Sequence, residues 1–220
     1  MAGDGALYLK NRTERLDFSY RLLRRTSEIK AVILRCFRDY STLNCLDIGA
    51  ADGIMLSSLN NEFGFGRAIG IDISTELFKE NGAIELEQGN AESLNFGENV
   101  FDIVIASAVI EHVDNPNKLL SECYRVLKKG GILVITTPNP FHDKIAVKIG
   151  YYSEKIHKEM FTLKKLNDYL IANSFKVIDS SYFMIFPFFR LPGEKLVESF
   201  LRLIHLGMLM SNQLAVGRKL

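Results

Sequence analysis

Cysteine is scarce in this chain, with three residues among 220, and Cys36, Cys45 and Cys123 lie far apart. They form no C-x-x-C pair and no Cys/His spacing typical of a metal site, which argues against a disulfide framework and a structural zinc site. An odd, sparse cysteine count without an N-terminal signal-peptide pattern predicts a protein of the reducing cytoplasm.

A charge excess and a long hydrophobic run are also missing. The 27 Lys and Arg residues nearly balance the 26 Asp and Glu residues, so the net charge of +1 argues against nucleic acid as a partner. In the apolar segment 184–211, the expected helix from Glu194 to about Met210 is interrupted by Arg202 and His205 and is shorter than the stretch of about 20 apolar residues that a transmembrane helix needs. With 47% hydrophobic residues, we expect one domain over residues 1–220.

The most informative segment is LDIGAADG, residues 46–53. An apolar strand at Cys45–Ile48 leads into a turn of small residues, which allows backbone N–H groups and a helix N-terminus to approach a ligand closely. A dinucleotide fingerprint needs Gly at relative positions one, three and six, but Ile54 stands at the sixth. Asp47 favours a positive ligand group, so S-adenosylmethionine, with its ammonium and no phosphate, fits better. An ordinary strand–turn–helix is the alternative interpretation.

Further strands alternate with helices, which indicates a doubly wound, mostly parallel sheet. Periodicity predicts a helix at Leu119–Leu127 with Lys128–Gly131 as its C-cap, and a helix from Thr162, as N-cap, to about Asn173. The remaining predicted strands are Ala68–Ile71, Ile84–Gln88, Phe101–Ala106, Ile132–Thr136 and Phe175–Phe183.

Five segments in order resemble the motifs of class I S-adenosylmethionine-dependent methyltransferases: LDIGAADG (46–53), GIDIS (70–74), GNAESLNF (89–96), FDIVIASAVIEHV (101–113) and LKKGGILVITTPNP (127–140). The resemblance is strongest to the small-molecule branch that includes ubiquinone and menaquinone biosynthesis methyltransferases. It implies a Rossmann-like α/β fold, a seven-stranded, mostly parallel sheet with an antiparallel last strand. Ala51 departs from the pattern, since many relatives have Gly there.

The resemblance also implies S-adenosylmethionine as cofactor and S-adenosylhomocysteine as product. Asp72, at the end of a strand, would accept the ribose hydroxyls. His112 would either contact the ligand or hold its loop by hydrogen bonds. The other implied cofactor residues are Asp47, Gly49, Ala50, Ala51 and Gly53 for the methionine part, Ile73, Asn90, Ala91 and Glu92 for the adenine, and Ser107 beneath the cofactor.

Two flanking segments are specific to this chain. Residues 6–40 are predicted to form an N-terminal helical cap, and residues 10–39 hold nine Lys or Arg and four Asp or Glu. In related enzymes such a segment covers the cofactor, so Arg12 or Arg15 is a candidate for its carboxylate and Tyr8 for the lid; a solvated basic surface is the alternative.

The second flanking segment, residues 184–211, is predicted to be an insertion between the last two strands, with a helix from Glu194 to about Met210. Three hypotheses compete for this apolar helix. It packs against the domain's own sheet, it forms a lid over an apolar acceptor with peripheral contact to a membrane, or it forms a homodimer interface.

The predicted function is methyl transfer to a small, apolar acceptor such as a lipid, a quinone precursor or an aromatic metabolite. The chemistry needs alignment of the acceptor and exclusion of water, and a base with a pKa near 7 if the acceptor must lose a proton. His157 is the first candidate for this base, followed by His142 and Tyr152. The fourth strand opens onto Ser107–Ile110, without the Asn/Asp-Pro-Pro-aromatic motif of amino-nitrogen methyltransferases. A protein methyltransferase and a non-catalytic cofactor-binding sensor are the alternatives.

Overall fold

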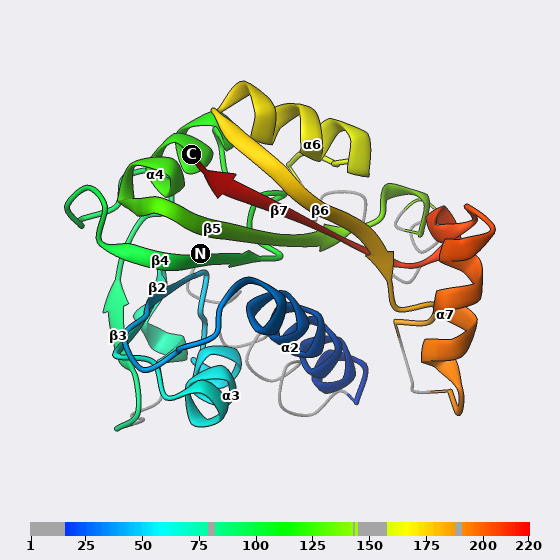
Figure 1. Ribbon diagram of the computed structural model, residues 1–220, viewed down its shortest axis with the longest axis horizontal. Helices are drawn as coiled ribbons and strands as arrows, with labels where there is room; N and C mark the ends of the chain where they lie inside the picture. Colours follow the sequence, from blue (N-terminus) through cyan, green and yellow to red (C-terminus); the bar gives the residue numbers. More distant parts are fainter. Residues whose placement is uncertain (1–15, 79–81, 143, 145–157, 188–190) are drawn as a thin grey trace.

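The structure is a computed structural model that describes residues 16–78, 82–142, 144, 158–187 and 191–220. Seven strands form a single sheet in the order β3-β2-β1-β4-β5-β7-β6 (Figure 1). The strands are β1 Asn44–Ile48, β2 Arg67–Asp72, β3 Glu85–Gln88, β4 Phe101–Ser107, β5 Leu127–Pro138, β6 Phe175–Phe183 and β7 Asn212–Lys219. The helices are α2 Leu16–Cys36, α3 Ile54–Phe63, α4 Pro116–Val126, α6 Leu163–Ala172 and α7 Glu194–Leu203, with short 3₁₀ turns η1 Thr75–Leu77 and η2 Gly207–Leu209.

The pairing of the strands confirms the predicted fold class. β1 pairs in parallel with β2 and β4, and β2 with β3 and β4 with β5 are also parallel. β7 runs antiparallel to both of its neighbours, β5 and β6. The sixth strand therefore has the same direction as the first five, and only the last strand is reversed.

Helices cover both faces of the sheet, with α2 and α3 on one face and α4 and α6 on the other (Figure 1). The central strands are buried on both faces, which explains their nearly continuous apolar sequences. In β4, Ile103 and Ile105 pack in the core that contains α2 and α3. Val104 and Ala106 pack with α4 and α6 on the opposite side. The period of two along a strand thus assigns alternate residues to two cores.

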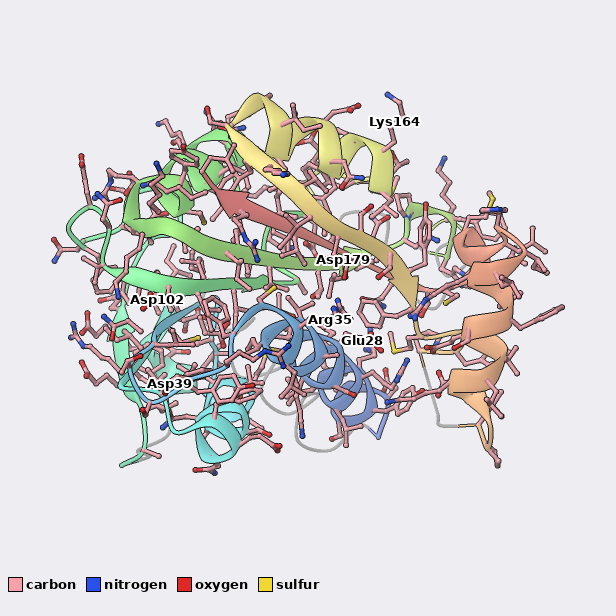
Figure 2. All side chains as sticks on the ribbon, viewed as in Figure 1. Glu28, Arg35, Asp39, Asp102, Lys164 and Asp179 are labelled. Carbon is pink, nitrogen blue, oxygen red and sulfur yellow. The ribbon has the colours of Figure 1, made fainter. Side chains whose placement is uncertain are left out.

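The long helix α2 is fastened to this sheet. Its residues Ile29, Val32 and Ile33 are buried in the core. Figure 2 shows Arg35 near the end of α2 beside Asp179 of β6, and the two side chains form an ion pair. The second half of α2 is consequently a structural layer of the domain.

Two predicted boundaries change in the structure. α4 begins at Pro116, because Asn115 caps it with a side-chain oxygen that accepts from the Lys118 N–H at 3.2 Å. The predicted C-cap at Lys128–Gly131 is wrong, since these residues belong to β5, which pairs from Leu127 onward through a register shift. The predicted helix at Thr162 is confirmed, with Thr162 as the N-cap of α6.

The predicted helix from Glu194 to about Met210 ends early. α7 stops at Leu203, His205 adopts a positive φ of 59°, and η2 follows. α7 lies beyond the carboxyl end of β6 (Figure 1). Leu196, Phe200 and Leu203 on its apolar side are exposed. The interpretation that this helix packs its apolar side against the sheet is therefore wrong.

Candidate active site

A cavity of about 610 Å³ opens at the carboxyl ends of β1, β2 and β4. From β1 the chain moves outward to β2 and β3 and then returns to β4 on the other side of β1. Such a switch in strand order leaves a crevice at the carboxyl ends, where α/β proteins bind ligands. The lining residues are Ile48, Gly49, Ala51, Ile71, Asp72, Ile73, Leu77, Gly89, Asn90, Ala91, Glu92, Ala108, Val109, His112, Val113, Asp114 and Lys158.

The loop after β1 forms the floor of the cavity with its backbone. Its alternate residues Gly49, Ala51 and Gly53 have positive φ values of 73°, 52° and 72°. The N–H groups of Gly49 and Ala50 donate to the Ile71 carbonyl at 2.8 and 2.9 Å, which binds the loop to β2. Ala51 tolerates the left-handed conformation at some energetic cost, which explains the preference for Gly in this motif.

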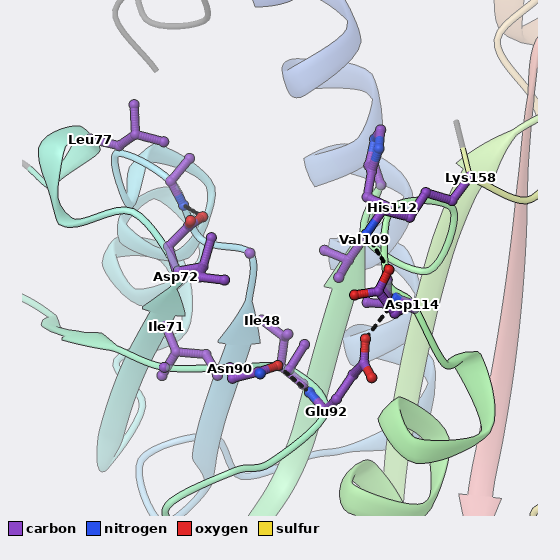
Figure 3. Close-up of a pocket in the computed structure, with 17 residues that line it drawn as sticks. Ile48, Ile71, Asp72, Leu77, Asn90, Glu92, Val109, His112, Asp114 and Lys158 are labelled. Carbon is purple, nitrogen blue, oxygen red and sulfur yellow. Dashed lines mark hydrogen bonds and ion pairs between the residues drawn. The ribbon is translucent and has the colours of Figure 1, made fainter. Parts of the chain in front are cut away.

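Asp72, at the end of β2, joins two turns beside the cavity. One carboxylate oxygen accepts from the Ala51 N–H at 2.9 Å and the other from the Ser74 N–H at 3.1 Å. Because each oxygen of an ionised carboxylate has a second lone pair, Asp72 retains the capacity to accept from a ligand. In Figure 3, Ile71, Asp72 and Leu77 form one wall of the cavity.

The segment after β3 supplies the lower rim. The Asn90 side-chain oxygen accepts from the Glu92 N–H at 2.8 Å. Glu92 Oε1 in turn accepts from the N–H groups of Asp114 and Asn115 at 2.7 and 3.2 Å. Glu92 therefore fixes the backbone that leads into α4. The Asn90 amide nitrogen is the polar group suited to a hydrogen bond with a ligand.

An ion pair of α4 that supports this rim was not predicted from the sequence. Arg125 of α4 donates to the carbonyls of Phe96 and Leu94 at 2.6 and 2.9 Å and pairs with Glu122. Glu122 also accepts from the Leu94 N–H at 2.7 Å. The hydrogen bond from Arg125, assisted by that N–H, lowers the pKa of Glu122 despite its partial burial. The carboxylate thus stays ionised and keeps the loop after Glu92 in place.

The loop after β4 forms the opposite wall, with Val109, His112, Asp114 and Lys158 in Figure 3. Lys158 Nζ pairs with Asp114 at 2.6 Å, and the Lys158 N–H donates to the Glu111 carbonyl at 2.9 Å. Val109 faces Gly49 so closely that a Cβ on Gly49 would lie 2.5 Å from it. Sequence reasoning missed Lys158, because no motif marks it and a backbone contact to Glu111 brings it to the cavity.

Seven of the predicted cofactor residues line this cavity: Gly49, Ala51, Asp72, Ile73, Asn90, Ala91 and Glu92. The other four lie behind its walls. Asp47 is buried in β1 between Gly70 and Ile105, and Gly53 precedes α3 beneath Ile84 and Leu86. Ala50 is buried against the Gly70 position, and the Ser107 hydroxyl lies 2.8 Å from that of Thr136. Contact with the cofactor stays a prediction for all eleven residues.

Most candidates for the base and the lid fall outside the described residues, namely His157, Tyr152, Tyr8, Arg12 and Arg15. His142 is described, and its Nε2 lies 2.6 Å from the Leu209 carbonyl oxygen. Since a carbonyl only accepts, Nε2 carries the proton, and Nδ1 is the basic position of this ring. His142 thus connects the turn after β5 with η2.

The cavity fits a positively charged nucleoside in size and in charge. Its lining contains three carboxylates, Asp72, Glu92 and Asp114, against the single ammonium group of Lys158. An excess of acidic groups in a crevice attracts a cationic ligand. The apolar side chains of Ile71, Ile73 and Leu77 offer a surface for a flat ring.

Comparison with known proteins supports the predicted resemblance. Residues 46–135 match the family model described as a methyltransferase domain. The resemblance to the class I S-adenosylmethionine-dependent methyltransferases is confirmed. S-adenosylmethionine, the predicted cofactor, is the cofactor of this family.

Curated relatives place this methyltransferase domain near the ubiquinone branch. It is 30% identical over 122 residues to the ubiquinone/menaquinone biosynthesis C-methyltransferase UbiE of Haemophilus ducreyi, covering 54% of this chain and 44% of that protein. It is 31% identical over 124 residues to a ubiquinone biosynthesis O-methyltransferase of Parvibaculum lavamentivorans, covering 52% and 48%. The chain spans about half the length of the curated relatives that it matches.

The methyltransferase fold extends over nearly the whole chain. A methyltransferase solved in complex with the Haloferax volcanii Trm112 methyltransferase activator superposes with a TM-score of 0.71 at 17% identity, over 97% of this chain and 93% of the other. This similarity includes the strands outside residues 46–135 and is one of fold.

Proposed function

We propose that this chain transfers the methyl group of S-adenosylmethionine to a small, apolar acceptor, such as a lipid, an isoprenoid quinone precursor or an aromatic metabolite. The observation that supports it is the acidic cavity at the switch point of the sheet, with Asp72 at the end of β2 facing the loop after β4. The branch of the family to which the curated relatives belong favours a small acceptor.

In this proposal, residues from two walls of the cavity bind the cofactor. Asp72 accepts hydrogen bonds from the ribose hydroxyls. Ile73 and Leu77 contact the adenine, and the Asn90 amide forms a hydrogen bond with the polar edge of that ring. The backbone of Gly49 and Ala51 borders the methionine part, with the carboxylates providing a favourable potential for its ammonium and the sulfonium. When bound, the cofactor supplies an already electrophilic methyl group, so that the protein acts mainly by positioning the acceptor and excluding water.

We propose His157 as the base for acceptors that must lose a proton. Lys158, the next residue in the chain, lines the cavity. A histidine has the pKa range that suits proton transfer near neutrality. His157→Gln should reduce turnover without changing cofactor affinity.

We propose further that residues 1–220 form one methyltransferase domain, in which residues 6–40 are a cap and residues 184–211 are an insertion. The position of α2 before β1 and of α7 between β6 and β7 is compatible with this division. Both segments lie outside the matched family model.

Methyl-labelled S-adenosylmethionine tests the function. The purified chain is incubated with a membrane-containing cell extract, and label is counted in lipid, small-metabolite and protein fractions, with Gly49→Ala as the inactive control. Label in the lipid or metabolite fraction supports the proposal. Label confined to protein indicates a protein methyltransferase, and cofactor binding without label in any fraction indicates a sensor.

A further inference from the structure

The helix α7 is amphipathic with its polar side turned inward. Glu194 and Glu198 are only 5% and 2% exposed. Leu196, Phe200 and Leu203 are 78%, 58% and 77% exposed. A surface helix of a globular protein normally has the reverse arrangement.

A buried arginine explains why the acidic side faces inward. Arg24 of α2 donates to both oxygens of Glu198 at 2.6 and 2.8 Å, and its Nε lies 3.9 Å from Glu194. The Tyr20 hydroxyl donates to Glu194, and the Met184 N–H donates to Glu198 Oε1 at 2.8 Å. Buried charges need such partners, so these contacts determine the orientation of α7.

The outward side of α7 continues into η2 as one apolar surface. We call it the α7 face, and its members are Leu196, Val197, Phe200, Leu203, Ile204, Leu206, Met208 and Leu209. All eight are exposed in the structure. A contiguous exposed surface of large apolar side chains marks an interaction site.

The charges around the α7 face have one sign. In the described residues 191–211, both acidic side chains are buried beside Arg24, and the exposed ionisable side chains are Lys195, Arg202 and His205. Arg202 also lies 3.7 Å from Glu198 and donates to the Tyr182 carbonyl, whereas Lys195 supplies the positive charge at the margin. An apolar helix side with a basic margin is the pattern that binds the interface of an anionic bilayer.

We infer that the α7 face docks on the surface of a bilayer that contains anionic phospholipids, with its apolar side chains at the level of the acyl-chain boundary and Lys195 among the headgroups. None of the helices that the structure describes has the length and hydrophobicity to span a bilayer, so the contact is a shallow one. A second copy fits less well, because a symmetric pair would bring the same basic margins together.

The α7 face also lies at the edge of the sheet where the cavity opens. Asn139, after β5, donates its amide to the carbonyls of Met208 and Met210 at 2.8 and 2.7 Å, and His142 contacts Leu209. Docking would therefore bring the carboxyl edge of the sheet toward the lipid. Delivery of an acceptor from the membrane rests on the proposed function, whereas lipid binding itself does not.

Vesicle sedimentation without cofactor tests the docking. The full chain is mixed with vesicles of phosphatidylcholine alone or with phosphatidylglycerol. We expect the chain to pellet with the anionic vesicles, and Leu196→Glu/Leu203→Glu to lower the bound fraction by about tenfold or more. Lys195→Glu should reduce binding to anionic vesicles only. Ile171→Glu, on α6, is the matched control, because Ile171 is 62% exposed and lies outside the face.

The outcomes separate the possible occupants. Loss of binding in the α7-face variant, with binding retained in Ile171→Glu and unchanged circular dichroism in both, supports the inference. Absence of wild-type binding to either vesicle overturns it, as does equal binding of the α7-face variant. A wild-type dimer that the α7-face substitutions dissociate, without vesicle binding, also overturns it in favour of a second copy. Calorimetry with S-adenosylmethionine on the same variants reports separately on the proposed function.

Discussion

At the scale of single residues, the site depends on a few positions where backbone and side chain meet. Asp72 is the clearest, because its two oxygens accept from Ala51 and Ser74 while it lines the cavity. Gly49 is the second, because its positive φ and its contact with Val109 leave no space for a side chain. Each position leads to a substitution with a matched control.

Asp72→Ala is expected to weaken S-adenosylmethionine binding by about 1–3 kcal/mol, because ligand hydroxyls lose a charged acceptor and the loop after β1 loses an anchor. Isothermal calorimetry measures the change. Asp39→Ala is the control, since Asp39 also accepts from a nearby backbone N–H, that of Ser41, in a loop outside the cavity. Equal affinities of wild type and Asp72→Ala would remove Asp72 from the site.

Gly49→Ala is expected to abolish measurable cofactor binding, because the new methyl group would lie 2.5 Å from Val109 Cγ2 and displace the cavity wall. Gly64→Ala has a similar positive φ of 61° but nothing within 4 Å of its Cβ. It therefore carries only the backbone cost of about 1 kcal/mol and should bind normally. If both variants bind alike in calorimetry, the close contact with Val109 has no role in the site.

At the scale of elements, the inward acidic side of α7 ties two distant helices together. Arg24 and Glu198 are 174 positions apart in the chain. Burial raises the pKa of Glu198 even though Arg24 and the Met184 N–H oppose the shift. Burial also tends to lower the pKa of Arg24, but the carboxylates of Glu198, Glu28 and Glu194 outweigh it and raise the pKa. The pairing is therefore more important for the position of α7 than as a net source of stability.

Arg24→Met should lower the free energy of unfolding by about 3–5 kcal/mol, because it removes the buried cation beside Glu194 and Glu198 and leaves Glu198 only the longer contact with Arg202, at 3.7 Å. Adding Glu194→Gln and Glu198→Gln should recover about half of the loss, since the uncompensated charges are removed. Urea unfolding measures both. As control, Lys164→Ala removes the exposed pair with Asp168 and should change stability by less than about 0.5 kcal/mol. An Arg24→Met change as small as that of Lys164→Ala would contradict the importance of this cluster.

At the scale of the whole molecule, residues 184–211 form an excursion from the sheet that carries α7. The two ends of this excursion, after β6 and before β7, lie side by side. The Met184 carbonyl accepts from the Ser211 N–H at 2.7 Å and from its hydroxyl at 2.6 Å. None of the described residues of this excursion lines the cofactor cavity. The excursion can therefore be removed without cutting a cavity wall.

Replacing residues 186–209 by two glycines, together with Arg24→Met to remove the stranded cation, should leave cofactor affinity within about threefold of wild type, since distant sites act independently. Methyl transfer should be lost, because the excursion is proposed to lie beside the acceptor. Calorimetry and the labelling assay measure the two effects, and Arg24→Met/Glu194→Gln/Glu198→Gln in the intact chain is the control. Turnover that survives the excision would separate the insertion from acceptor binding.

The strands along the chain, the loop after β1 and the position of Asp72 at the end of a strand could be predicted from the sequence. Apolar runs ending in Asp or Gly identify buried parallel strands, and parallel strands bring their carboxyl ends to one edge whatever the rest of the chain does. Prediction from local patterns was wrong where one segment suits two kinds of structure. Lys128–Gly131 has the composition of a helix C-cap, yet pairing with β4 makes it part of β5.

The chain alone thus determined its fold class and the region where its cofactor is expected, because those depend on local periodicity and on small residues at a turn. Only the tertiary structure decided which side of α7 faces outward. Periodicity shows that a helix has a polar and an apolar side, and the usual expectation places the apolar side inside. A buried arginine contributed by another helix reverses that choice, because a buried charge needs an opposite charge beside it and Glu194 and Glu198 of α7 supply that charge to Arg24.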